Sequence, residues 1–519
     1  MKSITILWVD DEIDMLTPHV LFLREKGYSV ITATNGESAI EQVATHLPDI
    51  IFLDENMPGI SGLETLSRIK NIRPEIPVVM ITKSEEEDIM DEAIGSKIAD
   101  YLIKPVNPKQ ILLSIKKNLD QERLVSEKTT SHYQSEFSHI GIQISESLSF
   151  NDWVTVYKKL VYWELELETS AGGEMEEIFH YQKAEANKEF AKYIKKNYLS
   201  WFDANNTNEK PLISPNLFRT KVFPLLDQGH KVFFILIDNL RLDQWRVLYS
   251  ELKNYYAIEN EDLYCSILPS TTQYARNALF SGLMPLEMSK MNPQLWINDD
   301  DEGSKNLNEE EFLSKQISRF GKTYKMYYEK ILNRKTEKKV LKNINDLMHN
   351  QLIVLIYNFV DMLSHARTNL DMIKELADDE SAYRTLTLSW FKHSHLREML
   401  IKLAHEKVKV VITTDHGSIK VENPVKVIGD RETTTNLRFK SGKNLNYNPK
   451  EVFEIRDVRK AHLPERPISH TYIFAANNDY FVYPNNYNHF VNYYRSTFQH
   501  GGISLDEMMI PIVVLNPHS

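Results

Sequence analysis

The segment from Lys407 to Gly417 ends in side chains whose types and spacing indicate a metal-binding site. It reads KVKVVITTDHG, so a continuous apolar and β-branched run ends directly in Asp415 and His416. Such a run predicts a strand buried on both faces of a parallel sheet, and the functional groups of open α/β sheets collect where the strands end. A carboxylate beside an imidazole at that edge suits a divalent cation. A DHG tripeptide alone is more often a turn, so the hypothesis depends on further residues of the same kind.

Three other segments contain carboxylates and imidazoles at predicted strand ends or near them. The strand KVFFILID ends at Asp238, the strand QLIVLIYNFVD ends at Asp361 with His365 four residues later, and His500 lies in the C-terminal segment FQHGG. If these segments meet at one sheet edge, they provide ligands for two metal ions. One predicted set is Asp361, His365 and His500, and the other is Asp238, Thr272, Asp415 and His416.

A second group of charged side chains falls within residues 1–120. Strands are predicted at ITILWV, VITA, DIIFLD, PVVMIT and DYLI, with helices between them that include one near residues 85–95. This alternation predicts a right-handed, doubly wound, flavodoxin-like sheet. The predicted strand ends carry Asp10, Asp11, Asp54, Thr82 and Lys104. Three carboxylates at one point repel one another unless Mg²⁺ binds them, and such a cluster makes an acceptor site for phosphoryl transfer.

The elements that must position these groups fall into three predicted domains of an α/β protein. Residues 1–120 form the flavodoxin-like domain, and residues 206–519 form a second α/β domain. Residues 121–205 show only helical patterns, with an apolar face typical of core building that contains Trp153, Tyr157, Leu160, Val161 and Trp163. We therefore expect a helical bundle that links the two larger domains, followed by the polar linker DANNTNEKP.

The composition excludes several classes of protein. A net charge of −11 argues against holding duplex nucleic acid by bulk electrostatics. The one cysteine, Cys265, excludes an intrachain disulfide and fits a reducing compartment. No signal peptide or membrane-spanning run is visible, so we expect a cytoplasmic protein without a membrane span.

Residues 1–120 resemble the receiver domains of two-component response regulators, because five positions agree with that family in order and location. The resemblance implies that Asp54 accepts a phosphoryl group from a partner sensor histidine kinase. It also implies a Mg²⁺ site formed by Asp10, Asp11, Asp54 and the backbone carbonyl of Asn56. Lys104 is implied to pair with the phosphoryl oxygens, and Thr82 with Tyr101 to form the switch pair.

Residues 212–519 resemble the alkaline phosphatase superfamily and, within it, the PglZ domains. In that superfamily the nucleophile lies ten residues before the glycine of a T-G or S-G pair, so Gly282 selects Thr272, with Thr271 as the alternative. The resemblance implies two Zn²⁺ ions and hydrolysis of a phosphate ester through a phosphothreonine, since coordination to zinc favours the alkoxide. The superfamily includes monoesterases, diesterases, sulfatases and mutases, so the metal ligands do not select among these reactions.

Two polar stretches, 283–345 and 420–470, are candidate insertions that select the substrate. The second is basic in an otherwise acidic chain, with Lys426, Arg431, Arg438, Lys440 and Lys443. A solvated loop and an oligonucleotide-backbone clamp are both compatible with this pattern, and the clamp would use Arg431 and Arg438 to bind substrate. Arg276 is a further candidate because it lies where sulfatase relatives carry an arginine; the alternative is a position on a helix surface.

The pairing of these domains resembles the PorX-type response regulators of the type IX secretion system. That resemblance implies phosphodiesterase activity on short cyclic and linear oligoadenylates, a homodimer on phosphorylation, and contact with an extracytoplasmic-function sigma factor. The alternative is a catalytically silent scaffold with a structural metal site, which acts by binding a sigma factor or a secretion component. Direct DNA binding is disfavoured because no helix-turn-helix pattern is present and the net charge opposes it.

Overall fold

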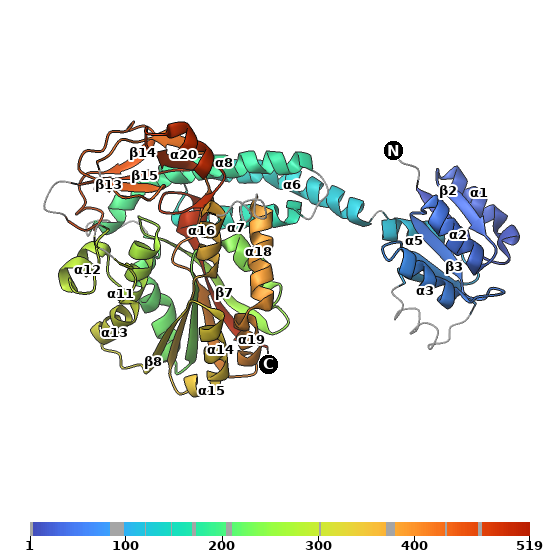
Figure 1. Cartoon of the computed structure of the whole chain (residues 1–519), viewed down its shortest axis with the longest axis horizontal. Helices are drawn as coiled ribbons and strands as arrows, with labels where there is room; N and C mark the ends of the chain where they lie inside the picture. The colour runs from blue at the N-terminus through green and yellow to red at the C-terminus, as the bar shows by residue number, and fades with distance from the viewer. Residues whose placement is uncertain are drawn as a thin grey trace. The chain divides into compact units, whose positions relative to one another are not determined.

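The computed structural model describes residues 4–83, 98–119, 121–146, 148–168, 173–203, 210–299, 301, 303–369, 379–430, 433–465 and 470–518. The chain divides into two compact units (Figure 1). One consists mainly of residues 1–132, and the other of residues 133–168 and 173–519. In the described part of the chain, no helix combines the length and apolar character needed to cross a membrane.

The N-terminal unit contains a parallel five-stranded sheet in the order β2-β1-β3-β4-β5, which confirms the predicted doubly wound fold. The apolar run of β1 is buried on both faces: Ile6 and Trp8 pack on one side, and Leu7 and Val9 on the other. The predicted helix near 85–95 lies outside the described residues. The strands are β1 Thr5–Val9, β2 Ser29–Ala33, β3 Ile50–Asp54, β4 Val78–Thr82 and β5 Asp100–Ile103; the helices are α1 Thr17–Glu25, α2 Gly36–His46, α3 Gly62–Ile72 and α5 Pro108–Leu119.

The described part of residues 121–197 is mainly helical, as predicted, and forms α6 Gln121–Ser145, α7 Phe150–Glu168 and α8 Gly173–Asn197. The predicted apolar face of α7 is buried, including Trp153 and Tyr157. Its residues belong to the same continuous apolar core as the sheet of the C-terminal domain. The helical region, which the sequence predicts as a bundle between two domains, is therefore built from residue 133 onward into the C-terminal unit.

The C-terminal unit is organised around a six-stranded sheet in the order β7-β18-β10-β6-β9-β8. Strands β10, β6, β9 and β8 are parallel, and β18 is antiparallel to its neighbours β7 and β10. The continuous apolar run LIVLIY of β9 is buried throughout, as expected for a strand covered on both faces. The bounds are β6 Lys231–Ile237, β7 Tyr256–Cys265, β8 Met326–Ile331, β9 Leu352–Tyr357, β10 Val408–Thr413 and β18 Met509–Pro517.

The two polar stretches are not simple surface insertions. The first contains β8, an edge strand of the central sheet, together with α12 Pro285–Met291, α13 Glu309–Arg319, α14 Arg334–Lys342 and α15 Ile344–Leu347. The second forms β12 Asn423–Lys426, β13 Phe439–Gly442 and β14 Val452–Ile455, and the last two pair with β15 Thr471–Ala475. Other helices and strands of this unit are α9 Phe223–Asp227, α10 Leu242–Tyr249, α11 Asn277–Ser281, α16 Phe359–Asn369, α18 Glu380–His393, α19 His395–Leu403, β11 Ile419–Lys420, β16 Asp479–Val482, α20 Tyr487–Tyr494, β17 Phe498–Gln499 and α21 Leu505–Met508.

Candidate functional site

One set of predicted ligands meets directly after β6 and β10, two neighbouring parallel strands of the sheet. Asp238, Asp415 and His416 are all buried, and each offers a ligand atom within 4.8 Å of the others. The Nε2 atom of His416 lies 3.7 Å from Asp238 Oδ1 and 3.8 Å from Asp415 Oδ2. Gly417 is required behind them because a Cβ there would lie 2.0 Å from the backbone oxygen of Asp506.

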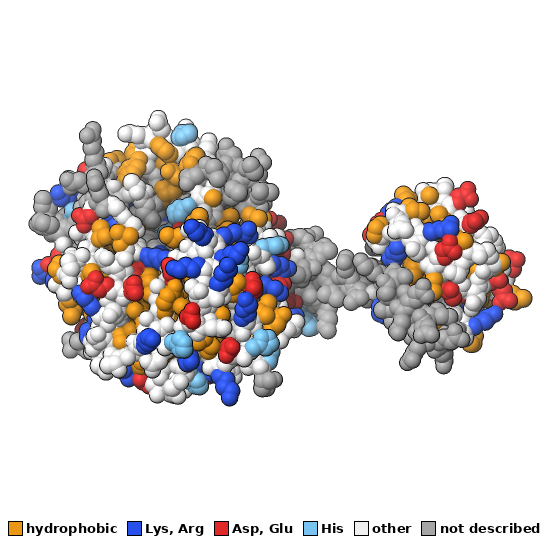
Figure 2. All heavy atoms as spheres, turned by 60° about the horizontal axis from the view of Figure 1, so that its bottom comes forward, with side chains coloured by type: hydrophobic (Ala, Val, Ile, Leu, Met, Phe, Trp, Pro, Cys, Tyr) orange, Lys and Arg blue, Asp and Glu red, His pale blue; other side chains and the backbone are white. Residues whose placement is uncertain are grey.

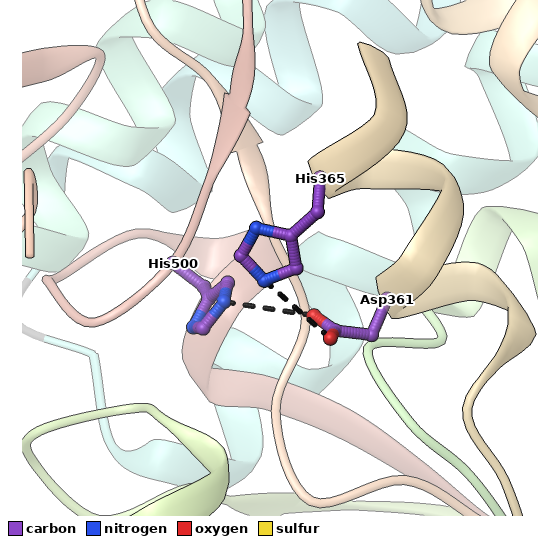
Figure 3. Close-up of side chains that lie close together, drawn as sticks. All are labelled: Asp361, His365 and His500. Atoms are coloured by element: carbon purple, nitrogen blue, oxygen red, sulfur yellow. Dashed lines mark ion pairs between the residues drawn. The ribbon is translucent and has the colours of Figure 1, made fainter. Parts of the chain in front are cut away.

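The second set consists of Asp361, His365 and His500 (Figure 3). Nε2 of His365 lies 3.5 Å from Asp361 Oδ2, and Nε2 of His500 lies 3.6 Å from Asp361 Oδ1. The prediction that Asp361 ends a strand is wrong: β9 ends at Tyr357, and Asp361 is the third residue of α16. The i,i+4 spacing then places Asp361 and His365 on one face of that helix.

Strand pairing brings the two sets together. Strand β11, which follows His416, pairs with β17, which directly precedes His500. As a result the rings of His416 and His500 stack, with centroids 4.3 Å apart. Six carboxylate and imidazole ligands from distant parts of the chain therefore lie at one edge of the sheet.

The hydroxyl of Thr272 is beside these ligands. Thr272 begins a single π-helical turn, Thr272–Arg276, and its Oγ1 lies 3.1 Å from His416 Nε2. Thr271, the alternative, is the N-cap of that turn and is more deeply buried than Thr272. Both threonines line a cleft of about 680 Å³ together with Gln273, Lys305, Asn306, Asn436, Phe439 and His500.

The electrostatics of the site fit positive ions. Burial, reinforced by repulsion from Asp238, raises the pKa of Asp415 to about 7 and that of Asp361 to about 6. In the described part of the chain, Asp238 Oδ1 and Asp415 Oδ2 are buried oxygens with no hydrogen-bond donor. Buried carboxylates need charged or hydrogen-bonding partners. Together with three imidazoles, this donor set suits two divalent cations of the zinc type.

Arg276 lies within the site, and two of its three guanidinium nitrogens face carboxylates. It is buried, with Nη2 3.1 Å from Asp238 Oδ2 and Nε 3.0 Å from Glu309 Oε1 and 3.5 Å from Asp415 Oδ2. The structure therefore corrects the helix-surface alternative for Arg276. Its assignment to substrate binding stays a prediction, since Nη1 has no hydrogen-bond partner among the described residues. Glu309, which no sequence motif singled out, is fully buried and also pairs with Lys330 Nζ at 2.8 Å.

One of the two residues of the predicted basic clamp, Arg438, does not face a substrate. Arg438 is fully buried and donates from Nε and Nη2 to Glu507, at 3.1 and 2.6 Å, so it supports β13 instead of facing a substrate. Lys440 is buried and donates to the backbone oxygen of Thr434 at 2.8 Å, and burial lowers its pKa to about 7. Arg431 lies outside the described residues.

A second buried network connects the helical region to the C-terminal domain. The carboxylates of Glu164, Asp243 and Glu380 cluster closely enough to hold a metal, but cationic side chains already occupy the space between them. Nη1 of Arg384 is 2.9 Å from both Glu164 and Asp243. Lys183 pairs with Glu164 at 2.9 Å, so this cluster is a salt-bridge network without need of an ion.

In the N-terminal unit, the predicted acceptor cluster lies at the ends of β1 and β3. Asp10 and Asp54 are buried, Asp11 is exposed, and all three offer oxygens within 4.8 Å of one another. Lys104 Nζ donates to Asp10 at 2.8 Å and to Asp54 at 2.9 Å. Burial raises the pKa of Asp54, and the hydrogen bond from Lys104 opposes that rise.

The predicted switch residues are also close to this cluster. Thr82 is buried at the end of β4, and a hydrogen bond links its side chain to Tyr101 on the neighbouring strand β5. Asn56 follows two residues after Asp54 and is exposed. The structure thus gathers the residues of the predicted receiver site at one end of its sheet.

Three family models match the chain. Residues 6–116 match the response regulator receiver domain, residues 123–202 match the PorX response regulator linker domain, and residues 217–515 match the BREX system PglZ alkaline phosphatase-like domain. The last match covers more than half of the chain.

Similar curated proteins match about a quarter of this chain. The transcriptional regulatory protein ZraR of Klebsiella oxytoca is 35% identical over 140 residues, which is 27% of this chain and 32% of that protein. The alkaline phosphatase synthesis transcriptional regulatory protein PhoP of Bacillus subtilis is 32% identical over 123 residues, which is 23% of this chain and 50% of that protein. Among solved structures, the crystal structure of a CheY-like receiver domain protein from Methanospirillum hungatei is similar to 23% of this chain, and the match covers 96% of that chain. The sequence identity is 26% and the TM-score is 0.23. The match therefore spans a third to a half of these two curated relatives.

Proposed function

Because this chain belongs to the PorX-type response regulators, with a receiver domain, a linker and a PglZ alkaline phosphatase-like domain, we propose that it is a zinc-dependent phosphodiesterase under phosphorylation control. One observation carries the catalytic part of the proposal. The hydroxyl of Thr272 lies beside two sets of three ligands, which come from separate segments and meet at one sheet edge. A receiver domain implies a phosphodonor such as a histidine kinase.

In the proposed reaction the Thr272 oxygen attacks the phosphorus of an ester. A Thr272–phosphate bond forms while the bond to the leaving oxygen breaks, and that oxygen takes up a proton. Water then cleaves the phosphothreonine and restores the hydroxyl. Two zinc ions bound by the six ligands would supply Lewis-acid stabilisation of the attacking and leaving oxygens.

The chain's own residues hold the reacting groups in position. The turn Thr272–Arg276, whose last three residues are buried, holds the hydroxyl 3.1 Å from His416 Nε2 and thus beside the proposed metal ligands. Arg276 keeps Asp238 and Asp415 in place by contacts to both carboxylates. The cleft of about 680 Å³ in front of Thr272 has room for a small ester with two substituents. Lys305 lines it and is the described side chain we assign to substrate contact, whereas Asn306, which also lines it, donates its amide to the backbone oxygen of Thr272 at 2.9 Å and so supports the nucleophile's turn.

The family resemblance extends the proposal further. We propose short cyclic and linear oligoadenylates as substrates, regulation of type IX secretion as the process, an extracytoplasmic-function sigma factor as a partner, and a cytoplasmic homodimer as the phosphorylated form. Phosphoryl transfer to Asp54, with Mg²⁺ bound by Asp10, Asp11, Asp54 and Asn56, would control activity or assembly.

The catalytic proposal is tested by comparing Thr272→Val with Thr272→Ser on a generic phosphodiester and a generic phosphomonoester. The valine variant should lose hydrolysis of the diester, and the serine variant should retain part of it because it keeps a hydroxyl. Both variants should bind as much zinc as the parent protein, measured by elemental analysis. A chelator should abolish hydrolysis by the parent. Undiminished hydrolysis by Thr272→Val refutes the nucleophile assignment, whereas absent hydrolysis by the zinc-loaded parent on all these esters and on oligoadenylates supports the silent scaffold.

The regulatory proposal requires a separate comparison. Asp54→Ala should abolish the response to acetyl phosphate and Mg²⁺, while it leaves zinc content and the fold unchanged. Hydrolysis rate and mass by light scattering, each measured before and after phosphorylation, distinguish control of activity from control of assembly. A response that survives in Asp54→Ala contradicts the assignment of the acceptor.

A further inference from the structure

We propose that the C-terminal unit carries a docking site for an acidic, amphipathic helix of a partner protein. The site, which we name the α14 groove, lies between the start of α14, helix α16 and helix α18. It has a volume of about 670 Å³ and is lined by apolar side chains that include Leu332, Phe359, Met362, Leu363 and Trp390. This proposal does not depend on the proposed enzymatic function.

The apolar floor of the groove combines two stacked rings with two exposed aliphatic side chains. Phe359 and Trp390 stack with ring centroids 4.7 Å apart and an angle of 4° between the ring planes. Leu332 is 59% exposed and Met362 is 57% exposed, although both are large apolar side chains. Exposed apolar surface next to a concavity is typical of a site that another molecule covers. An amphipathic helix inserts its apolar side chains into grooves of this kind.

The positive charge of helix α14, which borders the groove, indicates that the partner is acidic. Helix α14 reads RKTEKKVLK, with five basic residues and one acidic residue in a chain of net charge −11. The basic residues share one exposed face, and Arg334 also lines the groove. Their positions are Arg334, Lys335, Lys338, Lys339 and Lys342. Figure 2, which turns the lower side of Figure 1 forward, shows Lys and Arg side chains gathered on this face of the larger body.

Internal acids do not neutralise this face. Glu337, the acidic residue of α14, is buried and accepts a hydrogen bond from the backbone nitrogen of Leu396 at 3.1 Å. Its other oxygen lies 3.2 Å from His395 Nδ1. Among the described residues, no carboxylate forms an ion pair with the five basic side chains of α14. Acidic side chains of a partner would therefore meet Arg334 at the groove and the four lysines on the exposed face of the same helix.

An apolar groove next to a basic helix favours a protein segment over nucleic acid as the partner. A phosphate backbone would contact the lysines but would leave Leu332, Met362 and the Phe359–Trp390 stack uncovered. A helix with acidic residues on one side and Leu or Phe on the other contacts both parts. The groove also shares α16 with the metal site, since Met362 and Leu363 follow Asp361 directly.

The test uses fluorescence anisotropy with the full chain and a small panel of labelled synthetic helices. The first helix carries Leu and Phe at i, i+3, i+4 and i+7, with Glu elsewhere; in the second Lys replaces Glu, and in the third Ser replaces Leu and Phe. A DNA duplex of similar length is the fourth probe. We expect saturable binding of the first helix only, weakened by added salt.

Two variants of the groove and one matched control locate the binding. Leu332→Asp, and separately the combined Lys335→Glu, Lys338→Glu and Lys339→Glu, should each weaken binding on the order of tenfold or more. The control reverses the same number of exposed lysines elsewhere on this unit, at Lys188, Lys192 and Lys460, and should leave binding unchanged. Unchanged thermal unfolding shows that the variants remain folded, as expected because the altered side chains are exposed.

Four outcomes would overturn the proposal. These are the absence of binding to the acidic helix, binding that the groove variants leave unchanged, equal weakening by the control, and DNA binding that depends on the lysines but not on Leu332. Self-association of the chain that Leu332→Asp abolishes, without peptide binding, would assign the groove to a second copy instead.

Discussion

Substitution of Arg276 by methionine should lower the stability of the metal-free protein and strengthen its binding of zinc. Arg276 is buried among Asp238, Glu309 and Asp415, with contacts of 3.0 to 3.5 Å. Methionine fills most of the volume but provides no charge. The variant therefore leaves buried carboxylates that only cations can compensate.

The expected loss of stability depends on which positive partners the three carboxylates keep after the substitution. Removal of one member of a buried ion pair costs about 3–5 kcal/mol because the other charge is left uncompensated. When zinc is bound to Asp238 and Asp415, those two carboxylates keep a positive partner. Glu309 then loses one contact but retains Lys330 at 2.8 Å, so the cost falls to about 1–3 kcal/mol. The difference of about 2 kcal/mol must also appear in the zinc affinity, as tightening of roughly thirtyfold.

The assay is urea-induced unfolding followed by tryptophan fluorescence, with a chelator and with zinc in excess. Six of the seven tryptophans lie at Trp153 or later, so the signal reports mainly on the C-terminal unit. Arg438→Met is the matched control, because Arg438 is equally buried and pairs with Glu507 at 2.6 Å, but Glu507 belongs to neither ligand set. Its loss of stability should be the same with and without zinc.

Equal destabilisation of Arg276→Met under both conditions would refute the reasoning. So would unchanged or weakened zinc affinity, measured by competition with a chromogenic chelator. Either result would mean that Asp238 and Asp415 do not share a cation with Arg276.

Two further predictions concern lysines: Lys440, which is buried, and Lys104, which is partly buried. Lys440 has a pKa near 7 in the folded protein but near 10.4 when unfolded, so the unfolded chain binds more protons between these values and the free energy of unfolding rises with pH. Lys440→Met should therefore be more stable than the parent by about 4–5 kcal/mol near pH 6 and by about 2 kcal/mol near pH 9, measured by urea unfolding; an advantage that grows with pH would contradict this account. Lys104→Met should destabilise the receiver by about 2–3 kcal/mol, because Asp10 and Asp54 lose their shared cation, and Mg²⁺ should reduce the loss. Amide hydrogen exchange in β1 and β3 measures this effect, and unchanged protection would show that Lys104 does not balance the two carboxylates.

Local patterns were sufficient for much of the fold and for most of the candidate site. Continuous apolar runs predicted the buried strands β1, β3, β6, β9 and β10, because only a strand covered on both faces excludes polar residues so completely. The carboxylates that follow β6 and β10 were predicted for the same reason, since a parallel sheet delivers its strand ends to one edge. The i,i+4 spacing of Asp361 and His365 was visible too, although it was assigned to a strand end instead of a helix face.

Long-range packing decided what local patterns could not. The basic stretch at 420–470 has the composition of a solvated loop, yet Arg438 and Lys440 are buried, because Glu507 and the backbone oxygen of Thr434 accept their hydrogen bonds. Arg276 likewise had no local feature that distinguished a surface position from one among three carboxylates. A charged side chain is buried only where opposite charges from distant segments meet it, so its environment is a property of the tertiary structure.

The sequence by itself therefore determined which residues stand at the ends of strands and helices, including Asp54, Asp238, Asp415 and His416. Only the tertiary structure decided which of them share a site. The pairing of β11 with β17 brings His500 against His416, and the packing of α13 brings Glu309 to Arg276. Spacing along a strand or helix is set by backbone geometry within a few residues, whereas these contacts depend on how distant elements pack.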